Sequence, residues 1–243
     1  MSDAMTDLPE QPSPEIHHDH RDVSGGWLRP TVFGMMDGLV SNFALIAGIA
    51  GASATSTEVS LAGLAGLVGG AFSMSAGEYI SVQSQNESAQ AEIDVERYEL
   101  EHNAAAEQAE LAQMYVERGV DPDLAAKVAE QLSRDPDQAL LIHAQAELGV
   151  DPRQLPSPWT AAYSSFLAFS VGAFIPLVPY VFGAKSVWVS AVLAVFALFA
   201  AGVAASRFTS RSWRYSGTRQ LVLGVLAAAV TYGVGTLFHA AVS

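Results

Sequence analysis

The sequence contains the stretch GMMDGLVSNFALIAGIAG, from Gly34 to Gly51, in which Asp37 is the only charged residue. The stretch lies within Pro30 to Gly51, a window long enough to cross the hydrocarbon core of a membrane as a helix. A charged side chain inside such a helix is costly, and it marks a functional position by default. The stretch therefore predicts a membrane fold and a candidate site at Asp37.

Four more windows have the length and composition of spanning helices: Val59 to Val82, Thr160 to Phe182, Ser186 to Ser206 and Gln220 to Ala241. The last three contain no Asp, Glu, Lys or Arg, and the first of the four contains only Glu78. Half of the chain is hydrophobic and only 15% is charged, which is low for a soluble protein. Buried helices of a soluble protein are the weaker alternative, because such helices usually show a polar face. We therefore expect an all-α membrane protein with five transmembrane helices.

The composition divides the chain into four parts. A polar N-terminal tail (1–28) precedes transmembrane helices 1 and 2 (29–82), an acidic insertion (83–158) follows, and transmembrane helices 3 to 5 (159–243) end the chain. The tail contains His17, His18 and His20, which either recruit metal or belong to a mobile polar segment. Cysteine is absent, so any metal site must use oxygen, imidazole or thioether ligands.

The insertion between helices 2 and 3 is strongly acidic. Residues 83–158 hold sixteen Asp and Glu against five Lys and Arg, a net charge of −11 out of −13 for the whole chain. The segment is rich in Ala, Leu, Glu and Gln, which favours helix. Asp121-Pro122 and Asp135-Pro136 each have the form of a helix start, with Asp as the N-cap and Pro at the first helical position. We expect an acidic three-helix metal-binding domain.

The acidic side chains are aligned in a way that favours a bound cation. Positions 92, 96, 99, 103, 107 and 110 follow the spacing of one helical face, and all but Asn103 are Glu. Like charges along a helix repel each other, and a cation among them would remove that cost. Carboxylates suit Fe2+ or Mn2+, and a nearby imidazole, from His102 or His143, would favour these ions over Ca2+ or Mg2+. A solvated acidic face is the alternative.

Inside the membrane, depth places Asp37 of the first helix level with Met74 of the second. A carboxylate and a thioether together suit a divalent transition metal. Glu78 lies one turn nearer the cytosol on the same face as Met74, and it either passes the ion inward or extends to the interface. Whether Met35 or Met36 adds a second sulfur is open.

The basic residues predict the orientation. Arg21 and Arg29 precede the first helix, and four arginines crowd positions 207 to 219, whereas only Lys185 falls on the other side. By the positive-inside rule the N-terminus and the acidic domain are cytoplasmic and the C-terminus is outside. High Ala and Gly content and short loops favour a bacterial inner membrane.

Three segments resemble the vacuolar iron transporter (VIT) family: DGLVSNFALIAGIAGA (37–52), AFSMSAGEYISVQSQNE (71–87) and SSFLAFSVGAFIPLVPY (164–180). The resemblance covers nearly everything from about Trp27 onward. It implies a homodimer of five-helix subunits that exports Fe2+, and often Mn2+, from the cytosol in exchange for protons. It also implies that Asp37 and Met74 line the translocation pathway. For a eukaryotic source, the resemblance implies a vacuolar-type membrane.

The resemblance further implies that the cytoplasmic domain gathers metal through glutamates, here Glu96, Glu99, Glu107, Glu110 and Glu147. Plant members of the family carry a Met pair four and three residues before the last of these glutamates. His143 and Ala144 occupy those positions here, so one thioether is replaced by an imidazole. The bound and transported ion is Fe2+ or Mn2+, and no prosthetic group, nucleic acid partner or enzymatic activity is expected.

Two alternatives remain beside proton-coupled export. A membrane-anchored iron or manganese buffer or sensor would use its helices only to hold the acidic domain. Alternatively, the fold and transport are the same, but Mn2+ is the physiological ion and Fe2+ is incidental.

Overall fold

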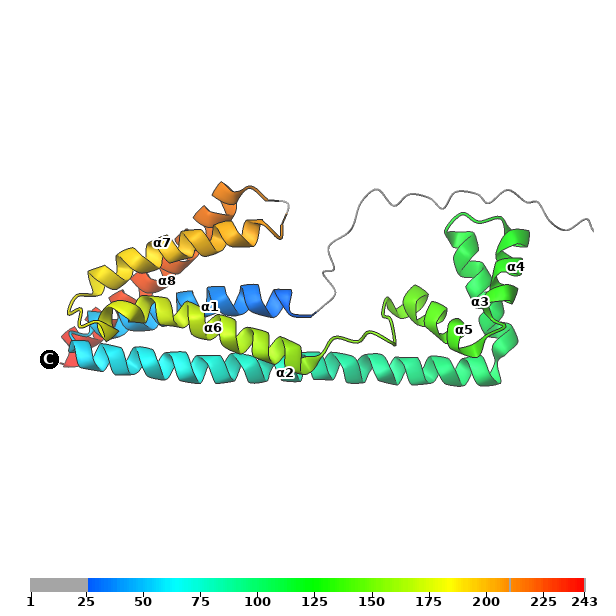
Figure 1. The fold of residues 1–243 in the computed structure, drawn as a ribbon, viewed down its shortest axis with the longest axis horizontal. Helices are drawn as coiled ribbons and strands as arrows, with labels where there is room; N and C mark the ends of the chain where they lie inside the picture. Colours follow the sequence, from blue (N-terminus) through cyan, green and yellow to red (C-terminus); the bar gives the residue numbers. More distant parts are fainter. Residues whose placement is uncertain (1–25, 210, 243) are drawn as a thin grey trace, which may run out of the picture.

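The computed structural model describes residues 26–209 and 211–242, and the regular structure in them is entirely helical. A bundle of long helices occupies one end of the molecule, and a group of short helices occupies the other (Figure 1). In chain order the elements are α1 (Leu28–Gly51), α2 (Ser56–His102), α3 (Ala104–Glu117), α4 (Pro122–Leu132), α5 (Pro136–His143), the π-helical turn η1 (Ala144–Leu148), α6 (Pro158–Val181), α7 (Val187–Ser206) and α8 (Trp213–Val242).

Five of these helices are long and apolar enough to cross a membrane: α1, α2, α6, α7 and α8. The expectation of five candidate spans in an all-helical chain is therefore confirmed. The predicted windows agree with the helices within a few residues at most ends. However, α2 continues past Val82 to His102, and α8 begins at Trp213 rather than at Gln220. Arg214 and Arg219 thus lie on the first turns of a helix and not in a loop, because the buried Ser216 and Gly217 pack against α7 and extend the helix.

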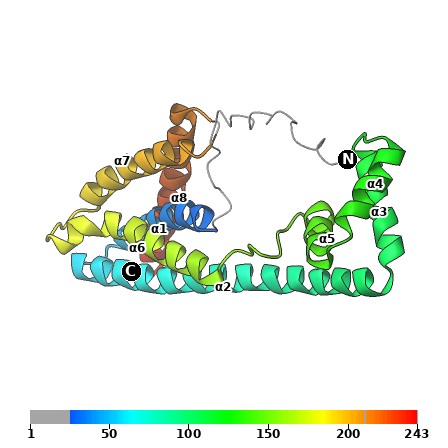
Figure 2. The ribbon, with the colours of Figure 1, turned by 45° about the vertical axis from the view of Figure 1, so that its right-hand side comes forward.

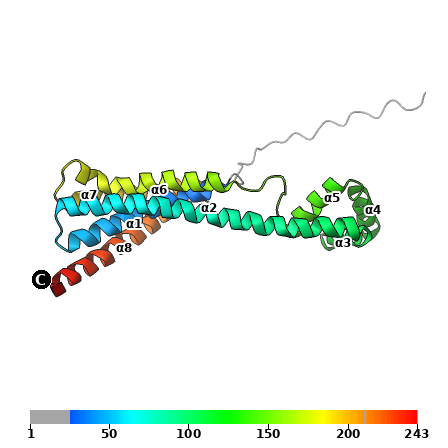
Figure 3. The ribbon, with the colours of Figure 1, turned by 90° about the horizontal axis from the view of Figure 1, so that it is seen from below.

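The helix α2 connects the two ends of the molecule. It begins with a capping box, in which Thr55 Oγ1 accepts from the backbone N–H of Glu58 and Glu58 Oε2 accepts from that of Thr55. Its 47 residues extend about 70 Å, so that its second half continues beyond the bundle (Figure 3). No Gly or Pro interrupts the helix between Gly77 and Asn103.

The bundle is built around α1, which contacts α2, α6, α7 and α8. Gly34 and Gly38 allow the backbones of α1 and α6 to meet, since a Cβ added at Gly38 would lie 3.0 Å from the backbone nitrogen of Ala173. The close backbone contact of α1 is therefore with α6. On α2, Gly70 contacts a side chain of α6 and not its backbone, because the ring of Phe169 packs against it.

Three apolar clusters fill the spaces between these helices. The first joins α1, α7 and α8 around Leu39 and Leu198, and the second joins α1, α2 and α6 around Ile46 and Leu177. The third lies between α2 and α6. Many large apolar side chains point outward from the same helices, which suits contact with lipid.

At the far end of α2 the acidic segment folds back on itself, and α3, α4 and α5 gather there (Figure 2). The helices α4 and α5 begin as predicted, because Asp121 and Asp135 each accept hydrogen bonds from the N–H groups of the first turn and each is followed by Pro. Ile93 of α2 packs against Leu140 of α5, which holds the short helices on the long one.

Candidate metal centre

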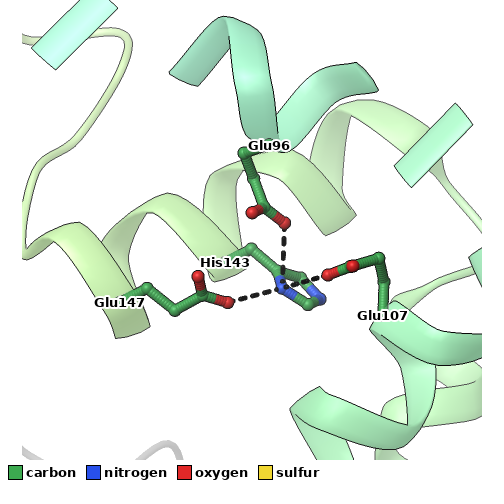
Figure 4. Close-up of side chains that lie close together, drawn as sticks. All are labelled: Glu96, Glu107, His143 and Glu147. Carbon is green, nitrogen blue, oxygen red and sulfur yellow. Dashed lines mark hydrogen bonds and ion pairs between the residues drawn. The ribbon is translucent and has the colours of Figure 1, made fainter. Parts of the chain in front are cut away.

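Four side chains of metal-ligating types, three Glu and one His, meet where α2, α3 and α5 come together (Figure 4). Glu96 comes from α2, Glu107 from α3, His143 from the end of α5 and Glu147 from η1. One ligand atom of each lies within 4.8 Å of the others. We call these four residues the acidic cluster.

The acidic cluster is centred on the imidazole of His143. Its Nδ1 lies 3.0 Å from Glu147 Oε1, 3.1 Å from Glu96 Oε1 and 3.8 Å from Glu107 Oε2. Ligands that share a metal at about 2.1 Å and at right angles are roughly 3 Å apart, so these separations suit a bound divalent ion. His143 itself is fully buried and Glu107 is 8% exposed.

The hydrogen bonds of the acidic cluster are incomplete. Nδ1 of His143 has a hydrogen bond with Glu147. Glu96 Oε1 is buried and lies 3.1 Å from the same Nδ1 as an ion pair, but it has no hydrogen bond with a described residue. His143 Nε2 is also buried and unpartnered within the same part of the chain. Buried polar atoms normally find a partner, so the acidic cluster has the donor set of a site that a cation would complete.

The electrostatics of the acidic cluster also favour a bound cation. Burial and the charge of Glu147 raise the pKa of Glu96 to about 7, although His143 acts in the opposite direction. Burial and the charge of Glu110 raise the pKa of Glu107 above its ordinary value. Carboxylates crowded in this way repel each other, and either protons or a divalent cation would relieve the repulsion.

Local structure explains how distant residues converge here. On one continuous helix Glu96 and Glu107 would be about 16 Å apart along the axis, too far to share an ion. The chain instead leaves the helical conformation at Asn103 (φ −127°, ψ 32°), and α3 turns back so that Glu107 faces Glu96. The six positions with the spacing of one helical face are therefore divided between two helices, α2 and α3.

A π-helical turn completes the site. Gly149, at φ 67°, ends η1 in the left-handed conformation that favours glycine. The turn carries Glu147 four residues after His143 and on the same side of the helix. Such π-helical turns are frequent at functional sites.

Three other predicted residues lie outside the acidic cluster. Glu99 is half-buried and accepts a hydrogen bond from Asn103 Nδ2, and Glu110 is exposed. Both are close enough for their charges to raise the pKa of Glu107. His102 stacks on Tyr98 with a centroid distance of 4.0 Å, so of the two candidate imidazoles only that of His143 lies among the carboxylates.

A second candidate site lies within the membrane bundle, in a groove of about 310 Å³ between α1 and α2. The lining consists of Asp37, Ser41, Asn42, Leu45, Gly66, Gly70, Ser73, Met74 and Phe169. The structure thus brings Asp37 and Met74 to one place, as their matched depth predicted. Neither Met35 nor Met36 is among these lining residues, so Met74 contributes the sulfur atom of the groove.

Glu78 lies one turn from Met74 along α2 and does not line the groove. Its side chain is 9% exposed and has no hydrogen bond or ion pair with another described residue. The histidines His17, His18 and His20 lie outside the described residues.

Three polar residues of the groove were not predicted: Ser41, Asn42 and Ser73. The signal that could have found two of them is spacing, since Ser41 lies four residues after Asp37 on one helical face and Ser73 precedes Met74. Asn42 belongs to neither pattern, and its position depends on the packing of α1 against α6.

Known proteins are similar to this chain across both the membrane bundle and the acidic segment. The family model described as the VIT family matches residues 28–236. A vacuolar iron transporter of Acanthamoeba castellanii is 38% identical over 228 residues, which cover 90% of this chain and 82% of the relative. Vacuolar iron transporter 1 of Arabidopsis thaliana is 32% identical over 231 residues, which cover 92% of this chain and 91% of the relative.

Proposed function

This chain belongs to the VIT family, and on that basis we propose that it is a proton-coupled transporter that carries Fe2+, and also Mn2+, out of the cytosol. The observation that carries the proposal is the groove between α1 and α2, where Asp37 and Met74 lie together inside the membrane-spanning part of the chain. A carboxylate supplies charge to a divalent ion, and a thioether discriminates against Mg2+ and Ca2+.

Asp37 would also supply the coupling to protons. A carboxylate in low-dielectric surroundings has to be neutralised, either by a proton or by a cation. Metal on one side of the membrane and protons on the other would then compete for the same group. Exchange at Asp37 therefore needs no separate proton site.

The acidic cluster would gather the ion before it enters the membrane. Its side chains offer three carboxylates and one imidazole, in an acidic segment (residues 83–158) of net charge −11. A field of one sign raises the local concentration of counter-ions. Glu99 and Glu110 add charge around the acidic cluster, and Glu78, buried on α2 between the segment and the groove, would pass the ion inward.

The arginines support an orientation with the acidic segment in the cytosol. Arg207 and Arg211 follow α7, and Arg214 and Arg219 lie on the first turns of α8, at the end of the bundle from which the acidic segment leaves. The positive-inside rule then places the C-terminus outside. We propose a bacterial inner membrane as the location.

A homodimer would cover the open side of the groove. Ser41 and Ser73 line the groove and are exposed in the single chain. Hydroxyl groups on a lipid-facing surface are unfavourable, whereas at a helix interface they can hydrogen-bond. A second copy of the chain against α1 and α2 would provide that interface.

The test is transport by purified protein in proteoliposomes with an imposed pH gradient. Asp37→Asn keeps the shape of the side chain but removes its charge, and it should abolish both Fe2+ and Mn2+ movement. The matched control is Asp94→Asn, because Asp94 is exposed, pairs with Arg97 and lies outside both sites. Full transport by Asp37→Asn would overturn the proposal and favour the alternative of a membrane-anchored metal buffer or sensor.

A further inference from the structure

Asn42 is a polar side chain of the groove to which the proposed function gives no role. It lies on α1 five residues after Asp37, about 7.5 Å further along the helix axis. Its side chain is 2% exposed, and it lines the groove together with Asp37 and Met74. A polar side chain this deeply buried in a spanning helix needs a reason.

The amide of Asn42 is held in one orientation. Its Nδ2 donates a hydrogen bond of 2.6 Å to the backbone carbonyl oxygen of Ala173 on α6. Since a carbonyl oxygen only accepts, the nitrogen of the amide has to face α6. The amide oxygen, Oδ1, must therefore face away from α6.

Asn42 Oδ1 is buried and has no hydrogen-bond partner among the described residues. It lies beside Gly66 of α2, where an added Cβ would be only 2.8 Å from the oxygen. Glycine at this position thus keeps a methyl group away from Oδ1. Hydrocarbon offers no donor to such an oxygen, so leaving it unpartnered is costly unless something else binds there.

We propose that Asn42 is a further ligand of the transported ion, and that its Oδ1 takes the divalent cation after Asp37 and Met74 release it. This inference rests on the proposed function. An amide oxygen is a suitable ligand for Mn2+ and Fe2+, and it carries no net charge. It therefore holds a cation less tightly than a carboxylate does, which suits a step from which the ion must leave.

The first variant for the test is Asn42→Leu, which removes the oxygen in a side chain of similar size. Transport of Mn2+ and Fe2+ is measured with the full chain in proteoliposomes. We expect kcat to fall at least about tenfold while KM stays within about threefold, because the ion still reaches Asp37 and Met74. Transport by Asn42→Leu at the wild-type kcat would overturn the inference.

The second variant, Asn42→Asp, separates a ligand from a helix-packing residue. A protonated Asp can donate to the carbonyl of Ala173 as the amide does, and its second oxygen remains in the place of Oδ1. We expect kcat to fall at least about threefold and KM to fall with it, since the ion displaces the proton and the resulting carboxylate holds the ion more tightly at the step from which it must leave. This variant decides the question if Asn42→Leu does not fold, and unchanged kinetics in it would overturn the inference.

Ser165→Ala is the matched control. The Ser165 hydroxyl is on α6, fully buried and unpartnered among the described residues, but Ser165 does not line the groove. Its removal should leave transport unchanged, and an equal loss in this variant would show that burial rather than ligation matters. If the wild-type protein does not transport metal, both the proposed function and this inference are overturned. If Asp37→Asn abolishes transport but Asn42→Leu leaves it unchanged, only this inference is overturned.

Discussion

At the scale of single residues, we propose that protons and metal ions compete for the acidic cluster. Glu96 is 9% exposed, faces His143, and has a pKa of about 7 because burial and neighbouring carboxylates disfavour its charge. A carboxyl group that holds a proton cannot bind a metal ion at the same oxygen. The affinity of the acidic cluster should therefore change in the physiological pH range.

We predict that Mn2+ affinity falls as the pH drops through about 7. Below that value each ion must displace the proton of Glu96, so the dissociation constant should rise by about tenfold per pH unit, and above it the affinity should level off. Isothermal titration between about pH 6 and pH 8 measures this, with Asp37→Asn as the background so that the groove does not contribute.

In that background Glu96→Gln should bind Mn2+ weakly and lose the pH dependence. The control is Glu92→Gln, because Glu92 is exposed on the same helix and lies outside the acidic cluster. A titration of the parent protein that is flat over this range would contradict the assignment of Glu96.

At the scale of elements, the contact between α1 and α6 positions the groove. The bond from Asn42 to Ala173 and the backbone contact at Gly38 hold the two helices in one register. A Cβ at Gly38 would collide with the backbone of Phe169 and Ala173, and backbone cannot rotate away as a side chain can.

We predict that Gly38→Ala lowers the free energy of unfolding by about 1 to 3 kcal/mol, because the added methyl group overpacks the contact. Thermal unfolding in detergent measures the change. Gly69→Ala is the matched control, since a Cβ at Gly69 meets nothing within 4 Å. Equal unfolding midpoints for the two variants would contradict the proposed role of this contact.

At the scale of the whole molecule, the acidic segment and the membrane bundle are joined at one junction, so the segment can be removed from the chain. The segment leaves the bundle through α2 and returns at α6, and the rings of Tyr79 and Trp159 are 4.9 Å apart at that junction. The two ends of the segment are therefore adjacent. A short linker can replace it without moving the spanning helices.

We predict that replacing residues 84–156 with a short Gly/Ser linker leaves transport in place at saturating metal. The KM should rise about tenfold, and its dependence on salt should weaken, because the field that concentrates cations is gone. Proteoliposome transport at several ionic strengths measures both effects. Complete loss of metal binding and transport in this variant would favour the buffer or sensor alternative.

Most of the architecture could be predicted from the sequence. Five apolar windows gave the candidate spans, and the Asp-Pro pairs at 121–122 and 135–136 gave the starts of α4 and α5, because span length and helix capping depend on residues close together in the chain. The resemblance of the three quoted segments to the VIT family is confirmed by the family match over residues 28–236. Depth along antiparallel helices was enough to bring Asp37 and Met74 together.

Tertiary structure decided which ligands meet and which polar atoms are left without a partner. The break at Asn103 turns α3 back so that Glu107 reaches Glu96 and His143, while Glu99 and Glu110 stay outside the acidic cluster. The orientation of Asn42 depends on one carbonyl of α6, 131 residues away in the sequence. Periodicity in the sequence determines which residues share a helix face. Which faces meet is determined only by the packing of separate helices, because that packing depends on contacts between residues that are far apart in the chain.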